Sequence, residues 1–227
     1  MKGQSSPRGD TRGNTYTDLG AIPGEAIRIS EESREIARRE IGDRDMEDRI
    51  RQRCSIAVGD MAMAGLLRFV NDPVTAGLSA LERRAPLIAD IRMVQVGIQR
   101  KGHESEVICA LDHSGRAEAE GITRARAGIL ALREEIYGAV VVIGNAPSAL
   151  LSLCDLIEGG CTPALVIGTP VGFVNAVESK ERLRSLPVPS ITNVGTRGGT
   201  PVAVAAINEI ITIFAEKRQL GKGHAGE

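Results

Sequence analysis

Two short apolar runs on either side of one helical segment constrain the fold of this chain more than any other feature. Residues 139–143 read AVVVI and residues 164–167 read ALVI, and such β-branched runs predict buried strands. Between them, Pro147 suits the first turn of a helix and Gly159-Gly160 suits its end. A strand, a helix and a second strand in this order form a βαβ unit. The unit predicts a parallel sheet with helices on both of its faces.

The rest of the chain extends this α/β pattern. Further strands are predicted at residues 86–90, 106–110 and 189–193, which gives a parallel sheet of five strands. Helices are predicted at residues 27–41, 45–69, 93–98, 115–137, 174–186 and 201–217. We therefore expect an N-terminal helical segment and the sheet within a single α/β domain over residues 18–217. The polar ends are predicted to be a disordered arm (residues 1–17) and a flexible tail (residues 218–227).

The composition argues against two classes of partner. Lys and Arg number 28 against 29 Asp and Glu, whereas a nucleic-acid binder needs a basic excess. Stacking on bases needs aromatic side chains, and the chain has no Trp, three Phe and two Tyr. No apolar run approaches the ~20 residues of a membrane span, and the N-terminus lacks the apolar core of a signal peptide. We therefore expect no nucleic-acid partner and no membrane partner.

The cysteines indicate the redox compartment. They are Cys54, Cys109, Cys154 and Cys161, with no Cys-x-x-Cys pair and no histidine at zinc-ligand spacing. We interpret them as free, mostly buried thiols, which are typical of a reducing compartment. The sequence thus predicts a cytoplasmic protein without a metal site.

A ligand site is expected where the strands end, because ligands of open parallel sheets bind outside the carboxyl ends of the strands. Those ends carry Asp90, Asp112, Gly144-Asn145, residues 168–170 and residues 193–199. Three of these turns lead into a helix, whose N–H groups and positive dipole end favour anions. With Arg197 in the last turn and Arg124 in a Gly-Ile-Thr-Arg turn, the set predicts a crevice for several carboxylates or phosphates. Nucleotides are the weaker alternative, because neither G-x-G-x-x-G after a strand nor a P-loop pattern occurs.

Several long blocks of the sequence resemble the precorrin-8X methylmutases, also called precorrin isomerases. The blocks are IADIRMVQVGI, GITRARAG, VIGNAPSAL, PALVIGTPVGFVNAVESKE and GTRGGT, and they occur in the family's order. The resemblance covers about residues 26–215. It implies a three-layer α/β/α, flavodoxin-like fold and a homodimer. It also implies an isomerase of cobalamin (vitamin B12) biosynthesis that moves a methyl group from carbon 11 to carbon 12 of the precorrin macrocycle, without a separate cofactor.

The resemblance also implies which residues contact the substrate. The substrate is a tetrapyrrole, a precorrin or cobalt-precorrin, whose acetate and propionate groups suit arginine and helix N-termini. The matched blocks imply these substrate-binding residues: Ser33, Thr123, Arg124, Asn145, Ser148, Arg197 and Gly198. Ser148 stands in place of a threonine, and Ala125 in place of a serine.

The histidine of this family is replaced in the present chain. The family carries it in the second helix in a pattern like Arg-x-x-His, and without gaps that pattern places the histidine at Ile56. An acid that protonates a ring nitrogen would lower the barrier of the methyl shift, and isoleucine cannot transfer a proton. Two residues remain as candidates for the acid. They are His113, after the second predicted strand, and Asp60, in the predicted second helix.

Three functions are therefore open. The first is a precorrin-8X methylmutase that works by positioning or with another acid. The second is a relative that binds a corrinoid or a precursor without isomerising it. The third is an unrelated flavodoxin-like enzyme that binds anions. A homodimer has an argument of its own, because the helix predicted at residues 45–69 is apolar over more arc than one sheet face covers.

Overall fold

Six strands form one sheet in the computed structural model of the protein, which describes residues 24–115 and 117–223. They are β1 (Leu67–Val70), β2 (Leu87–Ala89), β3 (Val107–Cys109), β4 (Val140–Ile143), β5 (Leu165–Gly168) and β6 (Ser190–Asn193). Their order across the sheet is β1-β6-β5-β4-β2-β3. Strands β2 to β6 are parallel, which confirms the five predicted strands, and β1 pairs antiparallel with β6.

The helices match most of the predicted positions. They are α1 (Gly24–Ile41), α2 (Met46–Val58), α3 (Met63–Leu66), α4 (Pro73–Glu82), α5 (Arg92–Gly97), η1 (Ala110–His113), α6 (Arg124–Ala131), α7 (Pro147–Glu158), α8 (Ala176–Arg184) and α9 (Thr200–Gly223). Helix α4 was not predicted, α3 falls within the helix predicted at residues 45–69, and α9 continues past its predicted end at residue 217. The predicted arm at residues 1–17 lies outside the described residues. Within the described part, no helix is long and apolar enough to cross a membrane.

The predicted second helix, residues 45–69, is wrong after residue 58. Helix α2 ends because Gly59 adopts a left-handed φ of 66°, a conformation that glycine reaches without steric cost. The chain then forms the short helix α3 and turns into the edge strand β1. Apolar residues that fit one helical stripe in the sequence are therefore divided between two helices and a strand.

The long helix predicted at residues 115–137 is also wrong. Its central part alone is helical, as α6, and Gly121 interrupts the chain before it with a left-handed φ of 63°. Thr123 then caps α6, since its hydroxyl accepts the backbone N–H of Arg126 at 3.2 Å. The cap gives Thr123 and Arg124 a fixed place at a helix start.

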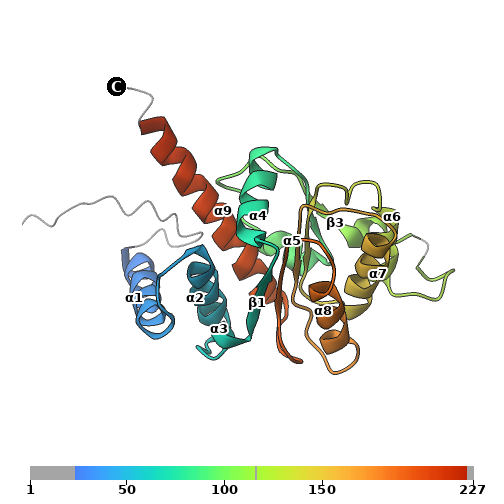
Figure 1. Cartoon of the computed structure of the whole chain (residues 1–227), viewed down its shortest axis with the longest axis horizontal. Coiled ribbons are helices and arrows are strands. Elements are labelled where there is room, and N and C mark those ends of the chain that lie inside the picture. The colour runs from blue at the N-terminus through green and yellow to red at the C-terminus, as the bar shows by residue number, and fades with distance from the viewer. Residues whose placement is uncertain (1–23, 116, 224–227) are drawn as a thin grey trace, which may run out of the picture.

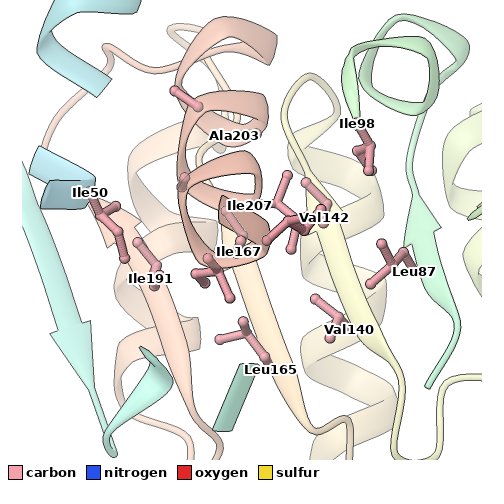
Figure 2. Close-up of a cluster of buried hydrophobic side chains, with 14 of the residues drawn as sticks. Ile50, Leu87, Ile98, Val140, Val142, Leu165, Ile167, Ile191, Ala203 and Ile207 are labelled. Atoms are coloured by element: carbon pink, nitrogen blue, oxygen red, sulfur yellow. The ribbon is translucent and has the colours of Figure 1, made fainter. Parts of the chain in front are cut away.

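Helices cover both faces of the sheet, which confirms the three-layer α/β/α architecture (Figure 1). One core cluster packs the sheet against α2, α4, α5 and α9, and a second packs it against α6, α7 and α8. In the first cluster, strand side chains such as Val142 and Ile167 lie beside Ile207 of α9 (Figure 2). Helix α1 packs on α2 at one end of the molecule, away from α6 to α8 (Figure 1).

Candidate functional site

A pocket of about 370 Å³ lies between α1, α2 and the first half of α9. It contains two of the positions that the sequence singled out, Ser33 of α1 and Ile56 of α2. Its wall also includes Arg34 and Arg53, with Val204 on the side of α9. The pocket thus joins apolar surface with two guanidinium groups.

A buried carboxylate fixes these arginines. Glu209 of α9 is fully buried, and its oxygens lie 3.4 Å from Arg34 and 3.0 Å from Arg53. A third arginine, Arg49, approaches Glu209 to 2.7 Å and also pairs with Glu216. Several charge-assisted hydrogen bonds offset the cost of burying this carboxylate. Glu209 therefore ties α1 and α2 to α9 around the pocket.

Among the described residues, the pocket wall has no group that could donate a proton near neutral pH. The described residues that line the pocket include no His, Asp, Glu or Cys, and Ile56 presents only a hydrocarbon side chain. Cys54, two positions before it, points into the core, where burial raises its pKa to about 12. The structure therefore does not supply another acid where Ile56 stands.

The glycine-rich turn at residues 195–199 carries Arg197, which forms an ion pair with Asp60. The hydrogen bond from Arg197 lowers the pKa of the Asp60 carboxyl, so Asp60 stays ionised near neutral pH. An ionised carboxylate has no proton to give, so we leave Asp60 out of the set of acids. Gly198 has a φ of 143°, and a Cβ there would lie 2.3 Å from the carbonyl oxygen of Thr169. That close backbone approach requires glycine.

The remaining site residues lie at the starts of α6 and α7 and at the end of η1. The hydroxyls of Thr123 and Ser148 lie 2.7 Å apart, which joins the starts of α6 and α7. The Arg124 Nε donates to the Ser114 hydroxyl at 3.3 Å, and the rest of its side chain is solvent-exposed. His113 is exposed at the end of η1. The predicted site residues thus form two groups, one around Thr123 and one around Ile56.

Asp90 occupies one of the predicted anion sites itself. This buried side chain at the end of β2 accepts the N–H groups of Gly144, Asn145 and Ala146 at 3.2, 2.8 and 2.9 Å. Burial raises the pKa of Asp90, while these three N–H groups act in the opposite direction. The start of α7 was expected to hold a ligand anion, and the structure corrects this, because its N–H groups already have a carboxylate partner. Asn145 keeps an exposed side chain beside that turn.

Sequence reasoning missed three charged residues around the site. Glu209 lies in an apolar helix, and Lys180 lies in a helix that is otherwise polar. Arg92, at the start of α5, pairs with Asp112 of η1, which follows β3. The position of Arg92 in the block IADIRMVQVGI was the one signal available, since residues after a parallel strand lie at the ligand-binding edge.

Fold and site together define a three-layer α/β protein with a pocket between α1, α2 and α9 that Arg34 and Arg53 help to line. The family model for precorrin-8X methylmutase matches residues 28–213. The chain is 42% identical over 206 residues to the cobalt-precorrin-8 methylmutase of Methanocaldococcus jannaschii, covering 85% of this chain and 96% of the relative. It therefore belongs to the precorrin-8X methylmutase family.

Two further comparisons agree with this assignment. The precorrin-8X methylmutase of Pseudomonas aeruginosa is 40% identical over 164 residues, which cover 69% of this chain and 79% of the relative. The solved structure of the precorrin-8X methylmutase from Thermus thermophilus superposes with a TM-score of 0.77 at 36% identity. It covers 84% of this chain and 97% of the other.

Proposed function

We propose that the protein is a precorrin-8X methylmutase, an isomerase of cobalamin biosynthesis that moves a methyl group from carbon 11 to carbon 12 of the macrocycle. The pocket between α1, α2 and α9 carries this proposal. Ser33 and Ile56, which map onto family positions in separate blocks, line one pocket with Arg34 and Arg53. The third open function, an unrelated anion-binding enzyme, is not retained, because the chain belongs to this family.

The methyl shift requires the protein mainly to hold the substrate in one orientation. A sigmatropic methyl shift is intramolecular, so it requires no nucleophile, metal or redox cofactor from the protein. The ring carboxylates of the tetrapyrrole would pair with exposed guanidinium groups such as Arg124. Holding the ring in one conformation and protonation state lowers the barrier by orientation. With Ile56 in the wall, we propose that positioning supplies most of the catalysis, with His113 as the remaining candidate acid.

A second candidate function follows from the same residue. Ile56 gives the described wall of the pocket no proton donor, while Arg34 and Arg53 line the same pocket. A protein that binds a corrinoid or its precursor without isomerising it would have these features. The two candidates differ in turnover and share the ligand.

Turnover is the decisive measurement. Pure protein would be mixed with precorrin-8X, and separately with cobalt-precorrin-8, and the absorbance spectrum followed for the appearance of product. A spectral change proportional to enzyme concentration supports the isomerase. Saturable binding without any spectral conversion supports the second candidate, and the absence of binding contradicts both.

Ligand binding by alanine variants would test whether Arg124 and Arg197 contact the ring carboxylates. Replacing either with alanine should weaken binding of hydrogenobyrinic acid, the expected product, by about 1.5–3 kcal/mol, the range for a charge-assisted hydrogen bond. Calorimetric titration measures the change directly. Arg126→Ala is the matched control, because this exposed arginine lies on the same helix as Arg124. Equal affinity in Arg124→Ala, Arg197→Ala and wild type would remove both residues from the site.

The assembly we propose is a homodimer, as the family resemblance implies. The apolar arc of α2 does not support a dimer, because α1 and α9 cover α2 within one chain. Exposed apolar side chains support it instead. They include Met93 and Val96 on α5 (62% and 70% exposed) and Phe173 and Val174 before α8 (94% and 75%).

Sedimentation would test the assembly. At micromolar concentration the chain, of 24.1 kDa, should sediment as a dimer. Val96→Lys or Phe173→Lys should shift the equilibrium towards monomer, because a buried ammonium group without a partner is costly. Exposed Arg133→Lys serves as the neutral control. A wild-type monomer at that concentration would contradict the proposal.

We place the protein in the cytoplasm. All four cysteines are free and buried, as predicted, and unpaired thiols are typical of a reducing compartment.

A further inference from the structure

Lys180 of α8 is a charged residue that nothing in the proposed chemistry uses. Its side chain is fully buried, and no carboxylate of the described residues lies within ion-pair distance of it. Its Nζ donates to the carbonyl oxygens of Gly195 and Arg197 at 2.6 and 2.8 Å, and it lies 3.4 Å from the Asn193 Oδ1. Burial lowers the pKa of this amine to about 8. The ammonium group thus sits among neutral oxygens.

Burying the Lys180 ammonium group among neutral oxygens lowers the stability of the folded state. A buried cation without an anion costs several kcal/mol unless hydrogen bonds compensate for the lost water. An apolar residue at the same position in α8 would avoid that cost. The hydrogen bonds of Lys180 offset part of this cost, and they all lead to residues 193–197.

Gly195 and Arg197 belong to the glycine-rich turn, residues 195–199. Gly195, Gly198 and Gly199 all have left-handed φ values, of 78°, 143° and 103°. Glycine in such positions leaves the backbone many alternative conformations, so the turn needs external contacts to hold one of them. The carbonyl of Arg197 receives two donors, the Lys180 Nζ and the Asn193 side-chain amide.

We propose that Lys180 is a positioning residue, whose ammonium group holds the carbonyls of Gly195 and Arg197 and so fixes the Arg197 side chain for contact with the ligand. The position of this side chain is set on both sides of the residue. The Lys180 ammonium group donates to the backbone carbonyl of Arg197, and the Asp60 carboxylate, just after α2, pairs with the Arg197 guanidinium. This inference rests on the proposed function, in which Arg197 meets a carboxylate of the tetrapyrrole.

The test combines ligand binding with hydrogen exchange on the full chain. Lys180→Met keeps the length of the side chain and removes the donors. Hydrogenobyrinic acid should bind this variant about tenfold or more weakly, the effect of one charge-assisted hydrogen bond. Lys180→Met/Arg197→Ala should bind no more weakly than Arg197→Ala alone, because both changes remove the same contact. Ser179→Ala, a buried neighbour in α8, is the control and should bind as wild type.

Hydrogen exchange separates the two proposals. The backbone N–H of Gly199 donates to Thr169 at 2.7 Å, so it should exchange slowly in wild type and faster in Lys180→Met. Faster exchange with unchanged ligand affinity would mean that Lys180 holds the turn but Arg197 does not meet the ligand, which overturns the positioning role. Unchanged exchange and unchanged affinity would overturn the inference entirely. Lys180→Gln, which keeps one uncharged donor group, is the variant to use if Lys180→Met does not fold.

Discussion

Ile56→His is expected to raise the isomerase activity of this protein by about 10²–10⁴-fold, the usual contribution of a general acid. The new imidazole would stand in the pocket wall with Ser33 and Arg53, at the position that the family resemblance implies for the histidine. An unperturbed histidine has a pKa of about 6.5, so it carries a transferable proton in the working range of such an enzyme. The gain should therefore shrink as the pH rises through the pKa of the histidine.

The measurement compares three proteins. Initial rates with precorrin-8X are followed by absorbance for wild type, Ile56→His and Ile56→Gln, where glutamine adds polarity without a transferable proton. A polar ring on a partly buried position costs about 1–3 kcal/mol of stability if it finds no partner, so circular dichroism must show that each variant is folded. A folded Ile56→His protein no faster than Ile56→Gln would mean that the pocket has changed beyond this residue.

The role of His113 would be decided in the same assay. If wild type is already fast, His113→Ala should lower the rate when His113 is the acid. If full activity remains in that variant, positioning alone explains catalysis, because Asp60 is held ionised by Arg197.

Glu209→Ala should cost about 3–5 kcal/mol in the free energy of unfolding, the range for removing one partner from a buried ion pair. Glu209 is fully buried and is shared by Arg34, Arg49 and Arg53, whose side chains are only 13–26% exposed. Without the carboxylate these guanidinium groups lose their common partner. The loss should appear in urea unfolding as a lower midpoint.

Glu216→Ala is the matched control for that experiment. Glu216 lies on the same helix and pairs with Arg49, but 22% of its side chain is exposed. A partly exposed pair typically contributes no more than about 1 kcal/mol. Similar small losses in both variants would show that burial of Glu209 does not strengthen its ion pairs.

Much of the sheet was predictable because its parallel strands are local and apolar. The runs ending at Ile143 and Ile167 are bounded by glycine or proline, so local pattern and tertiary burial agree. Strand β1 was not predictable, because Leu67 and Phe69 also continue the apolar spacing of α2. Its pairing with β6 is a contact between distant parts of the chain, which no local pattern records.

Part of the candidate site could be suggested from the sequence, but the contacts between its residues could not. Family blocks gave Ser33 and Ile56, and the structure brings these two residues into one pocket. Lys180 and Glu209 were missed because charged side chains in a helix are usually solvated, whereas both are fully buried here. Asp90 was noted as a strand end, but only the structure places its carboxylate on the N–H groups before α7.

The antiparallel pairing of β1 with β6 has a consequence for how the chain is made. During synthesis α1, α2 and β1 leave the ribosome early, but β6 and α9, against which β1 and α2 pack, leave late. The apolar side of α2, including Ile50 and Cys54, therefore stays uncovered by α9 while about two-thirds of the described chain is translated. The ligand pocket is then the last part of the protein to form, and a nascent chain that stops before α9 would be a substrate for chaperones and proteases.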